Sequence, residues 1–217
     1  IESNKRISQV FDTFNETKNN LTYNPINNDK YLNILEDLAS AINKLSEGDQ
    51  LKRLIKGGES VTLEFKEGYI YDFKKSKEKG KTIKSTSLKP RILKNIGSFL
   101  NNSEGGILLI GVHDDLSITG MDNEIKEFYK SSYDSFQNSF KDYIVDNLGI
   151  PAWHNLEAKF IEVDGKNIYK VECCFSKDTI YIKDHGVEKL PARLGPSSEL
   201  LEGKKMVEYL KTSNKNN

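Results

Sequence analysis

Apolar side chains follow a helical period along the first part of the chain, and that period stops at a pair of glycines. Within residues 7–14 they recur at i, i+3, i+4 and i+7, and the same period returns over residues 31–45. Gly57 and Gly58 then end the helical signal. The pattern therefore predicts a helical extension over residues 1–56, separate from the domain that follows it.

The period changes to two directly after these glycines. Apolar and polar residues alternate over residues 61–66, which predicts a half-buried strand, and again over residues 69–73, which predicts a second short strand. Residues 107–112 form a continuous apolar run, as expected of a central strand covered on both faces.

Helices and strands alternate along the remaining chain. Residues 57–212 are therefore expected to form one α/β (α+β) domain, in which a mixed β-sheet carries flanking helices. The polar residues 213–217 are expected to be a disordered tail. Helical spacing marks residues 88–100, 125–144 and 200–210, and strand-like runs occupy residues 156–163, 167–175, 179–183 and 187–194.

Composition narrows the class of protein without naming a partner. The 217 residues include 32 acidic and 32 basic side chains, so any nucleic-acid site must come from local segregation of charge. Adjacent Cys173 and Cys174 would point to opposite faces of a strand, which predicts a reduced, cytoplasmic protein without a disulfide. No apolar run is long enough for a membrane span. The chain begins with Ile1 rather than Met, which suits a fragment of a larger protein.

Positive charge is concentrated between residues 74 and 94, where only Glu78 opposes the basic side chains. Such a stretch either contacts a phosphate backbone without reading its sequence, or is a solvated flexible loop. Tyr69 and Tyr71 precede it, and they either stack on bases or pack inside the protein. The residues expected to bind nucleic acid are Lys66, Lys74, Lys75, Lys77, Lys79, Lys81, Lys84, Arg91 and Arg193. The alternative for Lys66 and Arg193 is an ion pair with a neighbouring acid.

Three segments in the same order resemble the Schlafen AlbA-like domain family, and together they span residues 57–212. Residues 57–66 read GGESVTLEFK, and residues 92–120 read ILKNIGSFLNNSEGGILLIGVHDDLSITG. The third segment, ARLGPSS, covers residues 192–198 and is followed by a predicted helix. Residues 1–56 have no counterpart in this resemblance.

The resemblance implies a nucleic-acid-binding groove, often built from two such lobes, and therefore a homodimer. It also implies that some members cleave RNA with three acidic residues and a divalent metal, Mg²⁺ or Mn²⁺. These acids correspond to Glu59, Glu64 and Asp114, with Asp115 as the alternative to Asp114. They are thus the predicted catalytic and metal-binding residues.

The chemistry of these acids is compatible with a metal site and also with solvated carboxylates that bind nothing. Carboxylates are preferred ligands of Mg²⁺ and Mn²⁺, but Glu59 and Glu64 converge only if the chain bends between them. Otherwise these acids and Asp114 are solvated surface groups. His113, beside Asp114, is either a general acid or base or a structural residue.

Two function classes follow from these observations. The first is a metal-dependent endoribonuclease acting on structured RNA such as tRNA. The second is a non-catalytic regulatory module that binds DNA or RNA, or an assembly domain. RNA is the favoured partner and DNA the alternative. No nucleotide cofactor is expected, because Gly105 and Gly106 lack the following Gly-Lys-Ser/Thr of a phosphate loop.

Overall fold

The computed structural model describes residues 47–213. The helices expected within residues 1–46 and residues 214–217 of the expected tail lie outside the described residues, whereas Ser213, the first residue of that tail, ends a helix. The described residues from 51 onwards belong to one compact unit. Its described part is a mixed α/β domain, which confirms the predicted fold class.

The larger sheet has four strands in the order β1-β2-β4-β3. Strand β1 (Leu63–Lys66) runs parallel to β2 (Gly106–Ile110), with Glu64 opposite Leu108. Strands β3 (Leu156–Val163) and β4 (Lys166–Cys173) form an antiparallel hairpin, and β4 pairs antiparallel with β2. Each of these strands lies within three residues of a predicted run at either end.

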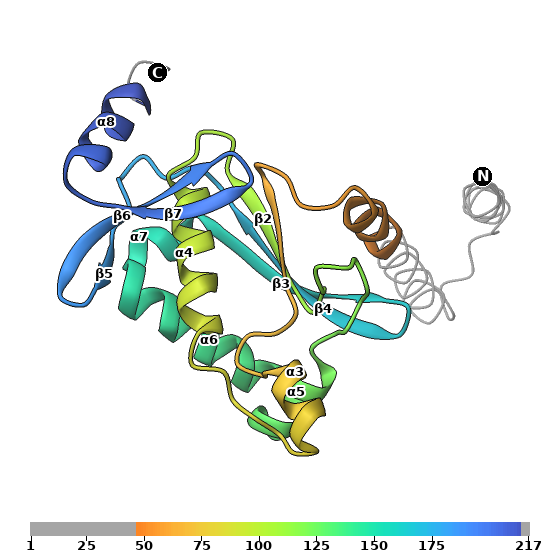
Figure 1. Cartoon of the computed structure of the whole chain (residues 1–217). Coiled ribbons are helices and arrows are strands. Elements are labelled where there is room, and N and C mark those ends of the chain that lie inside the picture. Colours follow the sequence, from red (N-terminus) through yellow and green to blue (C-terminus); the bar gives the residue numbers. More distant parts are fainter. Residues whose placement is uncertain (1–46, 214–217) are drawn as a thin grey trace, which may run out of the picture. The chain divides into compact units, whose positions relative to one another are not determined.

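Both faces of this sheet are covered, so its central strands are apolar on both sides (Figure 1). On one face lie α4 (Leu88–Leu100) and α6 (Tyr133–Leu148), whose buried Ile96 and Phe140 pack in the main core. On the other face, Leu51 and Ile55 from the helical residues 47–56 pack against buried Phe65 of β1. The two cores hold β1 and β2 rigidly in register.

A smaller antiparallel sheet packs on α4, which also contacts β2 and β4 of the larger sheet (Figure 1). It contains β5 (Ile182–Asp184), β6 (Val187–Leu194) and β7 (Ser197–Leu201), and α8 (Gly203–Ser213) follows it. The approach of α4 to β6 depends on Gly97, because a Cβ atom there would lie 2.7 Å from Cγ of Pro191. Helix α4 is therefore the layer shared by the two sheets.

Two predicted elements were wrong. The segment 69–73 is not a strand, because the backbone N–H groups of residues 69–71 donate hydrogen bonds to the buried carboxylate of Glu124. Phe73 already begins a helix, α3 (Phe73–Lys79). The long helix expected over 125–144 is two helices, α5 (Asp122–Tyr129) and α6. Lys130 and Ser131 have φ values of 53° and 61°, a conformation in which an α-helix cannot continue.

Two further elements did not stand out in the sequence. Strand β7 is short and polar at its start, and α7 (Ile150–His154) is a single turn after Gly149. The cysteines behave as expected, with Cys173 buried and Cys174 exposed, and neither is in a disulfide. Among the described residues, every helix is too short or too polar to cross a membrane.

Candidate functional site

Glu64 lies at the centre of a small network of charged side chains between β1, α4 and β6. Because alternate residues of a strand share a face, Glu64 and Lys66 lie on the same side of β1. This side is not the solvent side, since the two side chains are only 13% and 17% exposed. Oε1 of Glu64 accepts hydrogen bonds from Nζ of Lys66 at 2.6 Å and from Nδ2 of Asn95 at 3.2 Å. Oε2 accepts a hydrogen bond from Nη1 of Arg193 at 2.8 Å. Both carboxylate oxygens are therefore already engaged by donors.

The side chain of Arg193 is fully buried, with no exposed surface. Besides Glu64, its guanidinium donates to the carbonyl oxygens of Ser60 and Val61 and to Oγ of Ser198, and it lies 4.8 Å from the ring centroid of Phe99. No surface of Arg193 is left for a phosphate. Of its two predicted roles, the structure supports the ion pair with an acid and not contact with nucleic acid.

Glu59 is engaged by the backbone of the same strand. Its Oε1 accepts a hydrogen bond from N of Phe65 at 2.8 Å, while Lys66 Nζ donates to O of Phe65 at 2.6 Å. N of Ser60 donates to O of Leu63 at 3.0 Å. These contacts occupy backbone groups on the edge of β1 that does not face β2. Such groups would otherwise offer a template for pairing with another strand.

The three acids predicted to hold a metal are not brought together. Parallel pairing places Lys66 opposite Ile110, so Asp114 lies beyond the carboxyl end of β2 while Glu59 precedes β1. Asp114 is exposed, and within residues 47–213 no group of three His, Cys, Asp or Glu side chains could hold a metal ion. The chain does bend between Glu59 and Glu64, but the bend brings the carboxylate of Glu59 to the backbone N–H of Phe65 in β1. The described residues therefore do not fit Mg²⁺ or Mn²⁺ at this position.

The charges of Asp114 and its alternative Asp115 act on Glu67, which the sequence did not single out. Burial raises the pKa of Glu67; the nearby His113 lowers it in part, and Asp114 and Asp115 raise it further. Nδ1 of His113 lies 3.1 Å from Oδ1 of Asp115. The position of Glu67, at the carboxyl end of a strand parallel to β2, is the signal that could have identified it.

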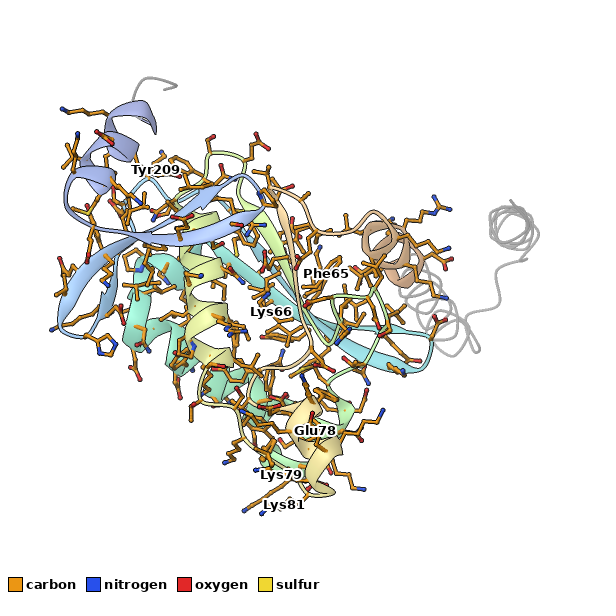
Figure 2. The ribbon with its side chains drawn as sticks, viewed as in Figure 1. Phe65, Lys66, Glu78, Lys79, Lys81 and Tyr209 are labelled. Atoms are coloured by element: carbon orange, nitrogen blue, oxygen red, sulfur yellow. The ribbon has the colours of Figure 1, made fainter. Side chains whose placement is uncertain are left out.

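The basic stretch begins with a short helix rather than the predicted flexible loop. Helix α3 starts after Asp72, whose Oδ1 accepts a hydrogen bond from N of Lys75 at 3.0 Å, and it ends at Gly80 with φ of 61°. The lysines of α3 are exposed, and Lys79 and the following Lys81 project from this end of the domain (Figure 2). The exposed basic side chains here are Lys74, Lys75, Lys77, Lys79 and Lys81.

The rest of the stretch is partly used in packing. Nζ of Lys84 lies 5.0 Å from the ring centroid of Phe128, and Nζ of Lys89 lies 4.8 Å from that of Tyr69. Burial lowers the pKa of Lys89. Tyr69 is buried among aromatic rings, so it cannot stack on a base, whereas Tyr71 is half-buried. Arg91 is exposed on α4.

Glu124 of α5 is a fully buried acid that sequence reasoning missed. Its carboxylate accepts hydrogen bonds from N of Tyr69 at 3.0 Å, of Ile70 at 2.8 Å and of Tyr71 at 3.3 Å. Burial raises the pKa of Glu124, and these three N–H groups offset part of that rise. Glu124 therefore fixes the turn that leads into the basic helix α3.

These contacts define a mixed α/β domain in which Arg193 of the smaller sheet forms an ion pair with Glu64 on the edge strand of the larger sheet. The basic helix α3 follows that edge strand in the chain. Residues 59–202 match the family described as Schlafen, AlbA_2. The chain belongs to this family.

Two further comparisons add little. No curated protein matches the chain. A crystal structure of the DIP2311 protein from Corynebacterium diphtheriae is similar, with a TM-score of 0.47 and 15% sequence identity. The similarity covers 70% of this chain and 27% of that chain, so this chain spans much less than the length of that protein.

Proposed function

We propose that this chain is a nucleic-acid-binding domain that holds a phosphate backbone, with RNA favoured, on α3 and the turn after it. The observation that carries the proposal is the row of exposed lysines from Lys74 to Lys81 in a chain with a formal net charge of zero. Exposed lysines on one element contact phosphates without reading bases. Glu124 supports the proposal, because it holds the preceding turn in place and so orders the helix.

Metal-dependent cleavage of structured RNA such as tRNA is the weaker proposal. Its support is the family resemblance of the motif around Glu59 and Glu64. The contacts of these two acids oppose it, because Glu64 accepts from Lys66, Asn95 and Arg193, and Glu59 accepts from the backbone of β1. The geometry thus favours a binding module over a nuclease.

Fluorescence anisotropy with labelled tRNA, single-stranded RNA and double-stranded DNA, at several salt concentrations, tests the binding proposal. We expect the logarithm of the binding constant to fall linearly with the logarithm of salt concentration, because bound lysines release counterions from the phosphates. An affinity too weak to measure at low salt for all three would overturn it.

The same RNA, incubated with Mn²⁺ or with EDTA and resolved on a denaturing gel, separates the two proposals. We expect intact RNA in both conditions. Cutting that requires Mn²⁺ and is lost in the Asp114→Ala variant, which removes an exposed carboxylate and should leave stability nearly unchanged, would show instead that the motif acids form a metal site when RNA is bound.

A homodimer remains part of the proposal. One α3 has seven residues and offers a small basic surface, whereas two copies related by a two-fold axis could engage one duplex together. Light scattering of the free protein and of its RNA complex tests this point. A single copy in both states would remove the dimer without affecting the binding proposal.

A further inference from the structure

A pocket of about 540 Å³ lies between α3 and the ends of β1 and β2. This volume falls within the range of small-molecule binding sites. The two strands are the parallel pair of the sheet, and the pocket is at their carboxyl ends. Ligands of open α/β sheets bind at such ends. The lining residues are Glu67, Tyr71, Phe73, Lys74, Ser76, Lys77, Gly80, Lys81, Thr82 and His113.

Three lysines give one wall of the pocket a concentrated positive charge. Lys74 and Lys77 come from α3, and Lys81 comes from the turn after Gly80. In the described part of the chain, none of the three forms an ion pair with a carboxylate, although Lys75 on the same helix pairs with Asp72 at 3.1 Å. Three unpaired ammonium groups around one cavity are suited to a phosphate.

The remaining lining residues offer different chemistry. Glu67 and His113 come from the strand ends and provide hydrogen-bonding groups away from α3. Tyr71 and Phe73, whose ring centroids are 4.4 Å apart in an edge-on arrangement, provide half-buried aromatic surface. A carboxylate that accepts from a ribose hydroxyl, and aromatic surface that contacts a base, are recurring features of nucleotide sites.

We propose that this pocket binds the 5′-phosphorylated terminal ribonucleotide of an RNA strand. The terminal phosphate lies against Lys74, Lys77 and Lys81, and Glu67 accepts a hydrogen bond from the ribose 2′-hydroxyl. A terminal phosphate monoester carries close to two negative charges, against one for an internal phosphodiester, so three lysines select the end of the strand. This inference rests on the proposed function, and it adds recognition of the end to general backbone contact.

The first test compares two RNA oligonucleotides of one sequence, with a 5′-phosphate or a 5′-hydroxyl, in anisotropy titrations of the full chain. We expect the phosphate to raise affinity about tenfold, since charge-assisted hydrogen bonds are the strong ones. The Lys77→Ala/Lys81→Ala variant should lose this advantage. The matched Lys75→Ala/Lys79→Ala variant removes the same charge from exposed lysines outside the pocket lining and should keep it.

The second test concerns the sugar and the source of the nucleotide. Replacing the terminal ribonucleotide by its deoxy form should weaken binding to wild type but change binding to the Glu67→Ala variant little. Adenosine monophosphate added as a competitor distinguishes a strand end from a free nucleotide. Competition at concentrations near the oligonucleotide affinity would assign the same phosphate and ribose chemistry to a free ribonucleotide.

Two outcomes separate this inference from the proposed function. Equal affinity for the two RNAs, with strong salt-dependent binding retained, would overturn the pocket assignment and leave backbone binding in place. Weak binding of every oligonucleotide, with tight binding of adenosine monophosphate that Lys77→Ala/Lys81→Ala abolishes, would overturn the proposed function and retain the pocket as a phosphate site.

Discussion

Nη1 of Arg193 lies 2.8 Å from Oε2 of Glu64, although the two residues are 129 positions apart in the chain. This ion pair connects the smaller sheet to the edge strand of the larger one, and the buried guanidinium also donates to Ser198 of β7. Two residues of the family motif are thus partners of each other. Their contacts hold the domain together and leave little of either group free for a ligand.

Replacing Glu64 should therefore lower the free energy of unfolding much more than replacing Asp114, although both residues were predicted to belong to one metal site. Glu64→Ala leaves the buried charge of Arg193 unpaired and should lower the free energy of unfolding by about 3–5 kcal/mol, as breaking a buried ion pair does. Asp114→Ala removes an exposed carboxylate and should change it by about 0.5 kcal/mol or less. Urea unfolding followed by circular dichroism measures both. A similar small loss in the two variants would contradict the role given to Glu64.

Charge reversal on α3 should weaken RNA binding regardless of sequence. Changing Lys77, Lys79 and Lys81 together to Glu should lower affinity at least about tenfold and flatten the salt dependence, because fewer counterions are released. The control changes Lys204, Lys205 and Lys211 of α8 to Glu, which alters net charge equally on another element. If both triple variants lose affinity to the same extent, net charge rather than the α3 surface determines binding.

Glu124→Ala should destabilise the domain by about 2–5 kcal/mol, because three backbone N–H groups lose their shared acceptor in a buried setting. The matched Glu127→Ala variant removes an exposed acid of the same helix and should have little effect. Thermal unfolding compares the two. Because Glu124 orders the turn before α3, hydrogen exchange of the amides of Tyr69 and Tyr71 should also accelerate in Glu124→Ala. Unchanged exchange at these amides would refute this anchoring role.

Asp122 should make the stability of the domain depend on pH at the acid end. Burial alone would raise its pKa, but hydrogen bonds from Asn167 and from the Tyr133 hydroxyl outweigh that effect and leave the pKa of Asp122 lowered. The Tyr133 hydroxyl donates to Oδ1 at 2.7 Å, and N of Asn167 donates to Oδ2 at 2.9 Å. The folded protein therefore binds this proton less tightly than the unfolded chain does.

A lowered carboxyl pKa stabilises the fold above the ordinary Asp value, and the contribution is lost as pH falls through the folded pKa. Asp122→Asn should accordingly cost about 1–3 kcal/mol near neutral pH. The difference from wild type should shrink as the pH falls below the ordinary Asp value of about 4 and towards the lower pKa of Asp122 in the folded protein. Unfolding free energies of both proteins between neutral and acid pH provide the measurement, and a difference that stays constant over this range would exclude the linkage.

Local periodicity was enough to identify most of the scaffold. Strand β1 and helix α4 arise where apolar residues repeat at two or about 3.6 positions, and β2 arises where they run without interruption. Both patterns are properties of neighbouring residues alone. The same local reading failed for residues 69–73. Their alternation resembles a strand, but the groups that would form a ladder are bound by Glu124, which lies more than 50 positions away.

The sequence by itself determined the fold class, the family motif and the stretch of basic residues, because each depends on the order and type of nearby residues. Only the tertiary structure decided what the motif acids touch. The sequence left Glu64 as either a metal ligand or a solvated surface acid, and the packing of β6 then placed Arg193 beside it. Parallel pairing of β1 with β2 likewise placed Asp114 beyond the carboxyl end of β2, where its charge acts on Glu67, while Glu59 precedes β1. A charged group acts on whichever partner the fold brings within a few ångströms, and that partner is set by packing between distant segments.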